Sequence, residues 1–169
     1  MENVVILTLH ALTTEEHKQL SELLVEVVND GASIGFIAPL SFEKAFHYWS
    51  TVLAEDTLLL VAKLNDQICG TVQLHLSTKE NGLHRAEVAK LLVLPSFRRL
   101  SIARQLLIEI EQLSRQYGRH LLFLDTREHD VSNLLYQSMG YCEAGKIPQF
   151  AKSSTGQFDA TVLYYKLLD

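Results

Sequence analysis

Apolar residues in the first part of the chain follow the spacing of a strand and then that of two helices. Residues 4–9 form a short apolar run that predicts a strand. Thr13 and Glu16 have the spacing of a capping box, so a helix is expected to start there and to end near Gly31. Ser41 is expected to cap a second helix. The apolar positions at helical spacing are Leu20, Leu23, Leu24, Val27 and Val28 in the first helix, and Phe42, Ala45, Phe46, Trp49, Val52 and Leu53 in the second.

The middle of the chain predicts an antiparallel meander followed by a helix. Three apolar segments, residues 57–64, 67–77 and 83–94, have the composition of strands. The dipeptides Asn65-Asp66 and Asn81-Gly82 are typical of the tight turns that join such strands. Apolar positions then recur at helical spacing over residues 98–117, and Gly118 is expected to end that helix.

The remaining segments complete an α/β pattern. Residues 120–126 predict a strand near the sheet centre, and residues 131–139 predict a short helix. Two more strands, one beginning near Tyr141 and one over residues 158–168, are expected around a loop that contains Pro148 and Gly156. This order predicts one α/β domain over residues 1–169, with a mixed, mostly antiparallel sheet of about seven strands and helices on both faces.

Composition limits the classes of protein that fit. With 169 residues, 47% hydrophobic and 21% charged, the chain is long enough to bury a core. The net charge of −5 argues against a nucleic-acid partner. Cys69 and Cys142 are far apart in sequence and are expected to be buried free thiols, with a disulfide as the alternative. Because Met1-Glu2-Asn3 lacks a basic start and no apolar run approaches about 20 residues, we expect a cytoplasmic protein without membrane contact.

Residues 93–104 are the most informative segment. An apolar strand enters it, a helix leaves it, and small and basic residues lie between them. Such a turn directs free backbone N–H groups and the positive end of a helix dipole to one point, where phosphate binds. The alternative is an ordinary helix start at which Arg98, Arg99 and Arg104 are solvated.

This segment resembles the acetyl-coenzyme A pyrophosphate loop of the GCN5-related N-acetyltransferases, or GNAT family. The family loop is Arg/Gln-x-x-Gly-x-Gly/Ala, and the chain has Arg98-Arg99-Leu100-Ser101-Ile102-Ala103, with serine at the middle glycine. We expect Ser101 to adopt an ordinary helical conformation in the first turn, which would preserve binding. The resemblance implies that acetyl-coenzyme A is the cosubstrate. Its pyrophosphate would contact the loop from Arg98 to Arg104, and its pantetheine arm would pair with the backbone of Leu91, Leu92 and Val93.

The second signature of the family is a short helix, approximately Asn-x-x-Ala-x-x-Phe-Tyr-x-x-x-Gly-Phe/Tyr. Tyr136, Gly140 and Tyr141 match it, whereas His129 replaces the asparagine that would contact the coenzyme. The family tyrosine usually protonates the leaving thiolate, and a phenol with a pKa near ~10 suits that step. The alternative for Tyr136 is a core tyrosine on an amphipathic helix.

Two carboxylates are candidates for deprotonating or orienting the amine. Glu87 lies in an otherwise apolar strand, where we expect it to share one face with Leu91 and Val93 while Lys90 lies on the other. Asp125 ends the strand over residues 120–126, the position that ligand sites favour. The alternatives are that Glu87 or Lys90 pairs across strands or faces solvent, and that Asp125 caps the next helix or binds loop backbone.

One branch of the family, the tabtoxin-resistance acetyltransferases, resembles the chain more closely than the general pattern. The likeness covers residues 84–95, 121–126 and the tail around Gly145, Pro148, Gly156 and Tyr164. It implies acetyl transfer to a small polar amine, such as an amino-acid-like toxin, an antibiotic or a metabolite, within a ternary complex. Two other functions stay open: a coenzyme-binding sensor without turnover, and a protein or peptide N-acetyltransferase. No metal is expected, residues 32–40 are expected to line the acceptor pocket, and a homodimer is one expectation, since many members of the family dimerise.

Overall fold

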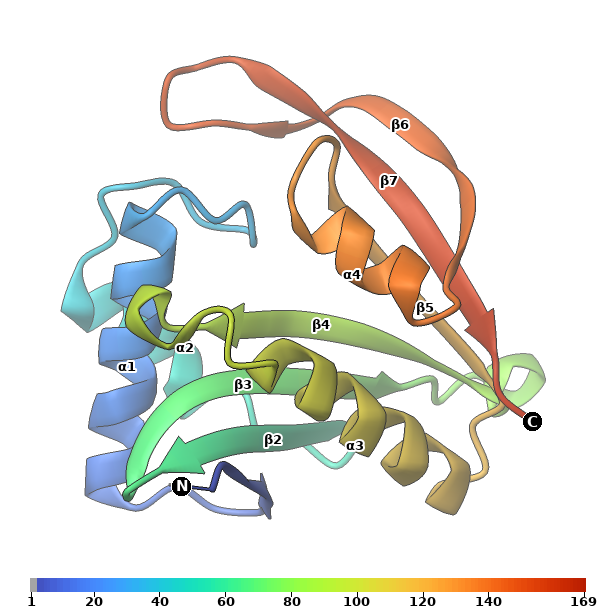
Figure 1. The fold of residues 1–169 in the computed structure, drawn as a ribbon, viewed down its shortest axis with the longest axis horizontal. Coiled ribbons are helices and arrows are strands. Elements are labelled where there is room, and N and C mark those ends of the chain that lie inside the picture. Colours follow the sequence, from blue (N-terminus) through green and yellow to red (C-terminus); the bar gives the residue numbers. More distant parts are fainter. Residues whose placement is uncertain (1–2) are drawn as a thin grey trace.

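A seven-stranded sheet forms the centre of the computed structural model, which describes residues 3–169 (Figure 1). Met1 and Glu2, at the start of the predicted domain, lie outside the described residues. The strands are β1 (Val5–Leu9), β2 (Thr57–Leu64), β3 (Gln67–Leu76), β4 (Arg85–Val93), β5 (Leu121–Arg127), β6 (Cys142–Lys152) and β7 (Phe158–Leu167). Their order is β1-β2-β3-β4-β5-β7-β6, and only β4 and β5 run parallel. The predicted α/β fold class is confirmed.

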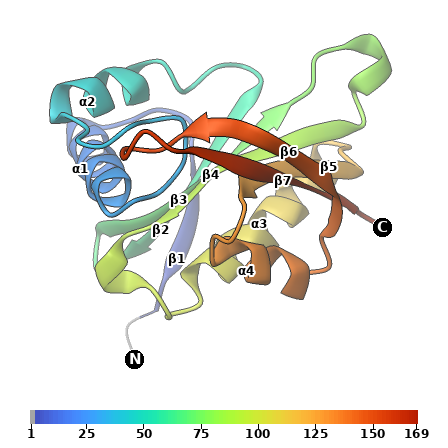
Figure 2. The same cartoon turned by 90° about the horizontal axis from the view of Figure 1, so that it is seen from above.

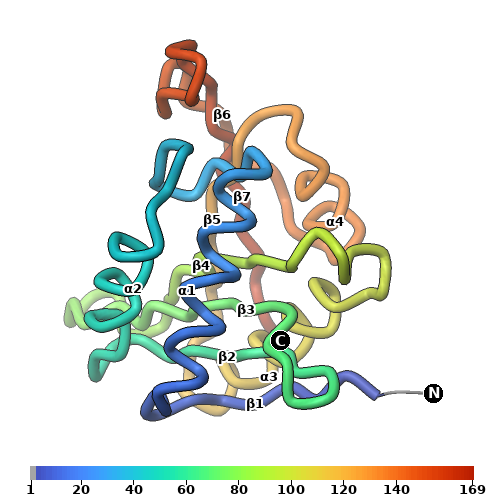
Figure 3. The backbone as a smooth tube through the Cα atoms, turned by 90° about the vertical axis from the view of Figure 1, so that its left-hand side faces the viewer, coloured from blue at the N-terminus to red at the C-terminus, as the bar shows by residue number. Residues whose placement is uncertain are grey.

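Helices cover both faces of this sheet, as Figures 2 and 3 show. α1 (Thr14–Asn29) and α2 (Phe42–Ser50) pack on one face, and α3 (Ile102–Gln116) and α4 (Ser132–Ser138) pack on the other. Each face therefore has its own apolar core. The core under α1 and α2 centres on Leu20, Leu24, Trp49, Leu59 and Val61, and the core under α3 and α4 on Leu60, Val72, Leu106, Ile110 and Leu122. None of the helices that the structure describes has the length and apolar character needed to cross a bilayer.

Several element boundaries follow the predicted local signals. The Thr13 side chain accepts from the Glu16 N–H, and the Glu16 carboxylate accepts from the Thr13 N–H, so the capping box is formed. Asn65 and Asp66 both have positive φ, 49° and 63°, as a two-residue hairpin turn requires.

Other predicted boundaries were wrong. Asn81 and Gly82 do not form a tight turn, because residues 80–82 wind into a short 3₁₀ helix within a longer connection. The helix expected from residue 98 begins only at Ile102, after a 3₁₀ turn over Pro95–Phe97. Pro148 lies within β6, where the pairing with β7 is irregular between Ile147 and Ala151.

The cysteines are both free, but only Cys69 is buried. The expectation of two buried thiols is therefore wrong for Cys142. It lies at the start of β6, an edge strand of the sheet, and its side chain is exposed.

A β-bulge interrupts β4 and corrects the expected alternation of its side chains. Thr71 pairs with Leu92 and Gln73 with Ala89, so Val72 faces two residues of β4, Lys90 and Leu91. Lys90 has a φ of 51°. Before the bulge, buried side chains of β4 point to the core under α3. Ala86 and Val88, before the bulge, are buried in the core under α3, whereas Leu92 and Leu94, after it, are buried in the core under α1 and α2. The even-numbered side chains therefore change face at the bulge.

β4 and β5 diverge soon after they meet. They pair only where Arg85, Ala86 and Glu87 lie beside Leu121, Leu122 and Phe123. Beyond Glu87, β4 keeps its hydrogen bonds to β3 but has no strand partner on its other side within residues 3–169. Figure 1 shows the two ribbons separating toward α4. This divergence opens the centre of the sheet, and the functional residues predicted from the sequence gather around it.

Candidate active site

A cleft of about 450 Å³ lies where β4 and β5 separate. Its floor is formed by residues 87–92 of β4 and 125–127 of β5. Residues 32–35 line one side, whereas residues 36–40 of the expected segment do not line the cleft. The β6–β7 hairpin contributes Phe150, Ala151, Ala160 and Thr161. Ser132 and Tyr136 reach it from α4. A volume of this size is that of a small-molecule site.

The three predicted acid–base residues, Glu87, Asp125 and Tyr136, all line this cleft. Glu87 is opposite Phe123 in the parallel pair, and Leu122 and Leu124 point to the core under α3, so the Glu87 and Asp125 side chains share the face that carries α1 and α2. Tyr136 comes from α4 on the opposite face. The divergence of the strands lets groups from both faces meet in one cleft.

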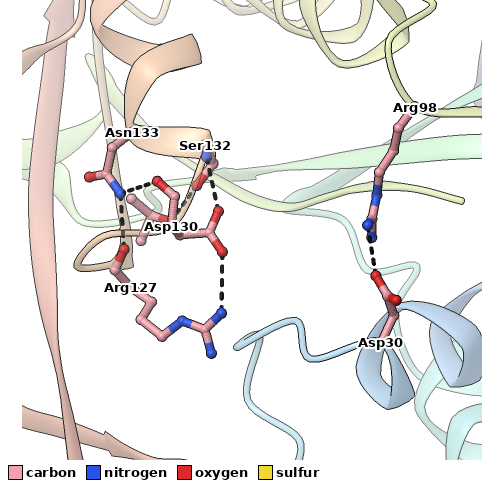
Figure 4. Close-up of polar contacts among 7 residues, drawn as sticks. Asp30, Arg98, Arg127, Asp130, Ser132 and Asn133 are labelled. Atoms are coloured by element: carbon pink, nitrogen blue, oxygen red, sulfur yellow. Dashed lines mark hydrogen bonds and ion pairs between the residues drawn. The ribbon is translucent and has the colours of Figure 1, made fainter. Parts of the chain in front are cut away.

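Asp125 accepts a hydrogen bond from the Thr161 hydroxyl of β7, with an O–O distance of 2.7 Å. The alternative that Asp125 caps the next helix is wrong, because the N–H of Ser132, the first residue of α4, donates to the Asp130 carboxylate instead. The Asp130 carboxylate accepts from the Ser132 N–H at 2.9 Å and pairs with the Arg127 guanidinium at 3.4 Å. Figure 4 shows this cluster, with Asn133 bridging to the backbone of Arg127 and Asp130.

Tyr136 is 6% exposed, and its ring packs against those of Tyr141 and Tyr164. The ring thus belongs to the core, as the alternative reading of Tyr136 expects, while the residue also lines the cleft. Burial, helped by the negative charges of Asp130 and Asp125, raises the pKa of the Tyr136 phenol far above its usual value. The hydroxyl therefore keeps its proton at neutral pH, as a proton donor must.

A second hollow of about 270 Å³ lies at the start of α3, lined by Val93, Phe97, Arg98, Arg99, Ser101, Ile102, Ala103, Arg104 and Leu135. The first hydrogen bond of α3 runs from the Gln105 N–H to the Ser101 carbonyl. The N–H groups of residues 102–104 therefore have no acceptor within the helix and mark its positive end. β4 connects the two hollows, since Leu91 and Leu92 line the cleft and Val93 lines this one.

Ser101 does not adopt the expected helical conformation. It precedes the first turn of α3 with φ 60° and ψ 15°, the left-handed conformation that glycine adopts without strain. Arg99 has a similar φ of 66°. The serine thus follows the backbone path of a glycine loop, and its Cβ is accommodated there at some cost in strain.

The loop arginines differ in their partners. The Arg98 guanidinium pairs with the Asp30 carboxylate at 2.7 Å, which holds the loop against the end of α1 (Figure 4). Arg104 donates to the Ser138 hydroxyl of α4 at 2.7 Å. In the alternative of an ordinary helix start these arginines are solvated, and the Arg98 side chain is still 48% exposed although it is paired with Asp30. Arg99 has no such partner among the described residues and lines the hollow.

Two predicted coenzyme contacts lie outside both hollows. Leu100 is 52% exposed at the tip of the loop. The His129 side chain is 89% exposed, and its nearest charged neighbour is Glu128 at 3.9 Å. His129, which replaces the family asparagine, therefore lines neither the cleft nor the hollow at α3.

The sequence did not identify Lys90, Arg127, Thr161 and Phe150 as site residues, although all four line the cleft. Lys90 had one signal, a charge in an apolar strand, but the bulge that orients it depends on the pairing of β4 with β3. Phe150 reaches the cleft from a hairpin near the end of the chain, and no local pattern indicates that.

Comparisons with known proteins agree with this geometry. The model of the acetyltransferase (GNAT) family matches residues 22–141. An uncharacterized N-acetyltransferase from the hisH–hisA intergenic region of Azospirillum brasilense is 30% identical over 131 residues, covering 76% of this chain and 78% of that protein.

Solved structures share the fold at lower identity. The ribosomal-protein-alanine N-acetyltransferase of Brucella melitensis has a TM-score of 0.78 at 20% identity, over 96% of this chain and 99% of that one. An aminoglycoside 6′-N-acetyltransferase in complex with coenzyme A has a TM-score of 0.78 at 16% identity, over 96% of both chains. Because the family model matches most of the chain, more than the fold is shared. The chain belongs to the acetyltransferase (GNAT) family, as an N-acetyltransferase.

Proposed function

We propose that the protein transfers the acetyl group of acetyl-coenzyme A to the amine of a small polar molecule, directly and within a ternary complex. The observation that carries the proposal is the convergence of Glu87, Asp125 and Tyr136 on one cleft, beside the unpaired edge of β4. The free thiols of Cys69 and Cys142 support a cytoplasmic enzyme built as one domain.

The structure offers a fitting surface for the coenzyme. The free N–H groups at the start of α3, together with Arg99, would hold the pyrophosphate in the hollow that they line. The backbone groups of Leu91, Leu92 and Val93 would pair with the pantetheine arm, because no described strand pairs with β4 on that side. The solved aminoglycoside enzyme with the same fold holds coenzyme A, which supports this assignment.

The chemistry follows from the positions of the acid–base groups. A free alkylamine has a pKa near ~10 and must lose a proton before it attacks the thioester. Glu87, with Asp125, would accept that proton directly or through one water. Nitrogen then attacks the carbonyl carbon, the C–S bond breaks, and the Tyr136 hydroxyl gives its proton to the departing thiolate. The nitrogen, positively charged after the attack, gives its second proton to the Tyr136 phenolate as the amide forms. The carboxylate releases the first proton to solvent, so one proton leaves per turnover.

The dimensions of the cleft favour a small acceptor over a protein. Residues 32–35 and the β6–β7 hairpin flank it, and the Glu87 and Asp125 carboxylates line it where the amine would lie. Relatives of the same fold are named for both aminoglycoside and ribosomal-protein acceptors, so fold alone does not select one. The resemblance to the tabtoxin-resistance branch supports the small polar amine.

Thermal unfolding with and without acetyl-coenzyme A, followed by thiol release against a panel of small amines, tests the proposal. A ligand that binds only the folded state adds about 2.7 kcal/mol at 100 times its dissociation constant, which raises the melting temperature by several degrees. We expect that shift together with amine-dependent thiol release. A shift without release from any amine would support the coenzyme-binding sensor instead. No shift would overturn the assignment of the loop at the start of α3.

A further inference from the structure

Lys90 is the one cleft residue whose backbone conformation is unusual for its type. A long side chain rarely has a φ of 51°, and within a strand this occurs only because the bulge opposite Val72 imposes it. Strained positions of this kind persist at sites where they orient a functional group. Without the bulge, Lys90 would point to the core under α3 and would not share a face with Glu87.

The surroundings of the Lys90 ammonium are desolvated. The Nζ atom lies 6.0 Å from the ring centroid of Tyr48, and a Cβ placed on Gly35 would lie 3.8 Å from it. Tyr48 is tied to Gln73, whose amide donates to the Tyr48 hydroxyl at 2.9 Å. Burial lowers the pKa of Lys90, while the charges of Glu87 and Asp125 oppose that change.

The other charged groups of the cleft already have partners or a role. Arg127 pairs with Asp130, and Asp125 accepts from Thr161. Within residues 3–169, no carboxylate lies within ion-pair distance of the Lys90 ammonium, and no hydrogen bond is formed by it. A half-buried cation without a direct partner is costly, and an anionic group of a bound ligand would remove that cost.

We propose that Lys90 binds a carboxylate of the acceptor, so that the enzyme acetylates zwitterionic molecules carrying both an amine and a carboxylate. This inference rests on the proposed function and specifies its substrate class. The amine would lie toward Glu87 and Asp125, next to the thioester, and the carboxylate toward Lys90 and Tyr48. The cleft thus offers an acidic and a basic subsite on the same sheet face, matched to the two charges of the acceptor.

The test compares each acceptor with its carboxamide. Thiol release is measured for the common L-amino acids, β-alanine and γ-aminobutyrate, and for the amide of each, at saturating acetyl-coenzyme A. For the best acceptor we expect the acid to have a kcat/KM about tenfold or more above that of its amide, mainly through KM. Binding of the acid and of its amide is also measured by calorimetry in the presence of coenzyme A, which carries no acetyl group. We expect the acid to bind more tightly than the amide.

Lys90→Met is expected to raise the KM of the acid about tenfold or more and to change the KM of the amide much less, which removes the preference. Lys90→Arg keeps the charge and should retain part of it. Lys152→Met, an exposed change outside the cleft, controls for the loss of one positive charge. If Lys90→Met does not fold, the comparison of acid and amide in the unaltered enzyme still decides.

The outcomes separate the two proposals. Thiol release without any preference for the acid, or an equal preference in Lys90→Met, would overturn the role of Lys90 and leave acetyl transfer to amines intact. No release with any acid or amide, while the wider amine panel is active, would overturn the zwitterionic class alone. No release with any amine at all would overturn the proposed function itself.

Discussion

At the scale of single residues, Ser101 combines a family-like backbone with a side chain that the conformation disfavours. A left-handed residue with a Cβ costs about 1 kcal/mol or more relative to glycine. We therefore predict that Ser101→Gly stabilises the protein by about 1 kcal/mol and raises its melting temperature by about 2–4 °C. Thermal unfolding without ligand measures this.

The same variant tests the loop as a phosphate site. Coenzyme affinity should be equal or higher in Ser101→Gly, because the free N–H groups of α3 are unchanged. Ser101→Ala is the matched control, since it keeps the strained Cβ and removes only the hydroxyl. Weaker coenzyme binding by both variants would mean that the hydroxyl itself contacts phosphate.

Tyr136 offers a prediction about turnover and pH. Tyr136→Phe should lower kcat about 100-fold or more with little change in coenzyme affinity, because it removes a proton donor and leaves the ring in place. Since burial raises the pKa of Tyr136 above its usual value near ~10, the phenol stays protonated across neutral and mildly alkaline pH. The kcat of the unaltered enzyme should therefore not fall between about pH 7 and pH 9 through loss of this proton.

Steady-state kinetics and coenzyme titration check both statements. Tyr141→Phe is the control, because its ring lies 5.7 Å from that of Tyr136 while the residue does not line the cleft. It should keep nearly full turnover. Equal turnover in Tyr136→Phe would contradict the role as proton donor.

Residue types and spacing were sufficient to find Glu87, Asp125 and Tyr136, since each stands in a recognisable motif or interrupts an apolar pattern. They were not sufficient for Lys90. Its position depends on an extra residue in β4 relative to β3, and a bulge has no fixed composition unless it contains glycine. The conformation of Ser101 was missed for a similar reason, because the helix was expected to start earlier.

At the scale of elements, the packing of α3 on β3 positions the phosphate loop. A Cβ on Gly70 would lie 3.0 Å from the Ile102 Cγ2 atom and 3.0 Å from the Leu92 carbonyl oxygen. We predict that Gly70→Ala destabilises the protein by about 1–3 kcal/mol and weakens coenzyme binding, because Ile102 begins the helix whose N–H groups we propose hold the pyrophosphate. Denaturant unfolding and coenzyme titration measure the two effects.

A double variant separates this contact from a general loss of stability. In an Ile102→Ala background the methyl group that meets the new Cβ is absent, so Gly70→Ala should cost less there. Equal costs in the two backgrounds would show that the contact with Ile102 does not cause the destabilisation.

Element identity was easier to predict than element ends. The hairpin at Asn65-Asp66 formed as expected because both residues tolerate positive φ. Asn81-Gly82 carries an equally strong turn signal, yet it lies in a 3₁₀ helix, since the chain between β3 and β4 is longer than a two-residue turn. A dipeptide preference cannot specify how far the flanking strands extend.

At the scale of the whole molecule, the sheet is least continuous beside the cleft. β4 and β5 pair over only a short stretch, so other contacts must hold the two halves together. The Lys166 ammonium of β7 binds both carboxylate oxygens of Glu111 in α3 at 2.8 Å and the Met139 carbonyl at 2.7 Å. This buried ion pair links β7, α3 and the end of α4 across the divergence.

We predict that Glu111→Ala destabilises the protein by about 3 kcal/mol or more, because it leaves the Lys166 charge half-buried and unpaired. Equilibrium unfolding in urea measures the change. Glu22→Ala breaks the exposed pair with Lys18 and should cost less than about 1 kcal/mol. Similar effects of the two substitutions would mean that the pair between α3 and β7 does not join the halves of the sheet.

The β6–β7 hairpin has a consequence for how such a protein diversifies. The family model matches residues 22–141, which include the loop at the start of α3, whereas Phe150, Ala151, Ala160 and Thr161 reach the cleft from beyond that segment. The donor side and part of the acceptor side thus belong to separate stretches of chain. Under the proposed function, substitutions in the hairpin would change which acceptor fits the cleft and leave the residues proposed to hold the donor unchanged.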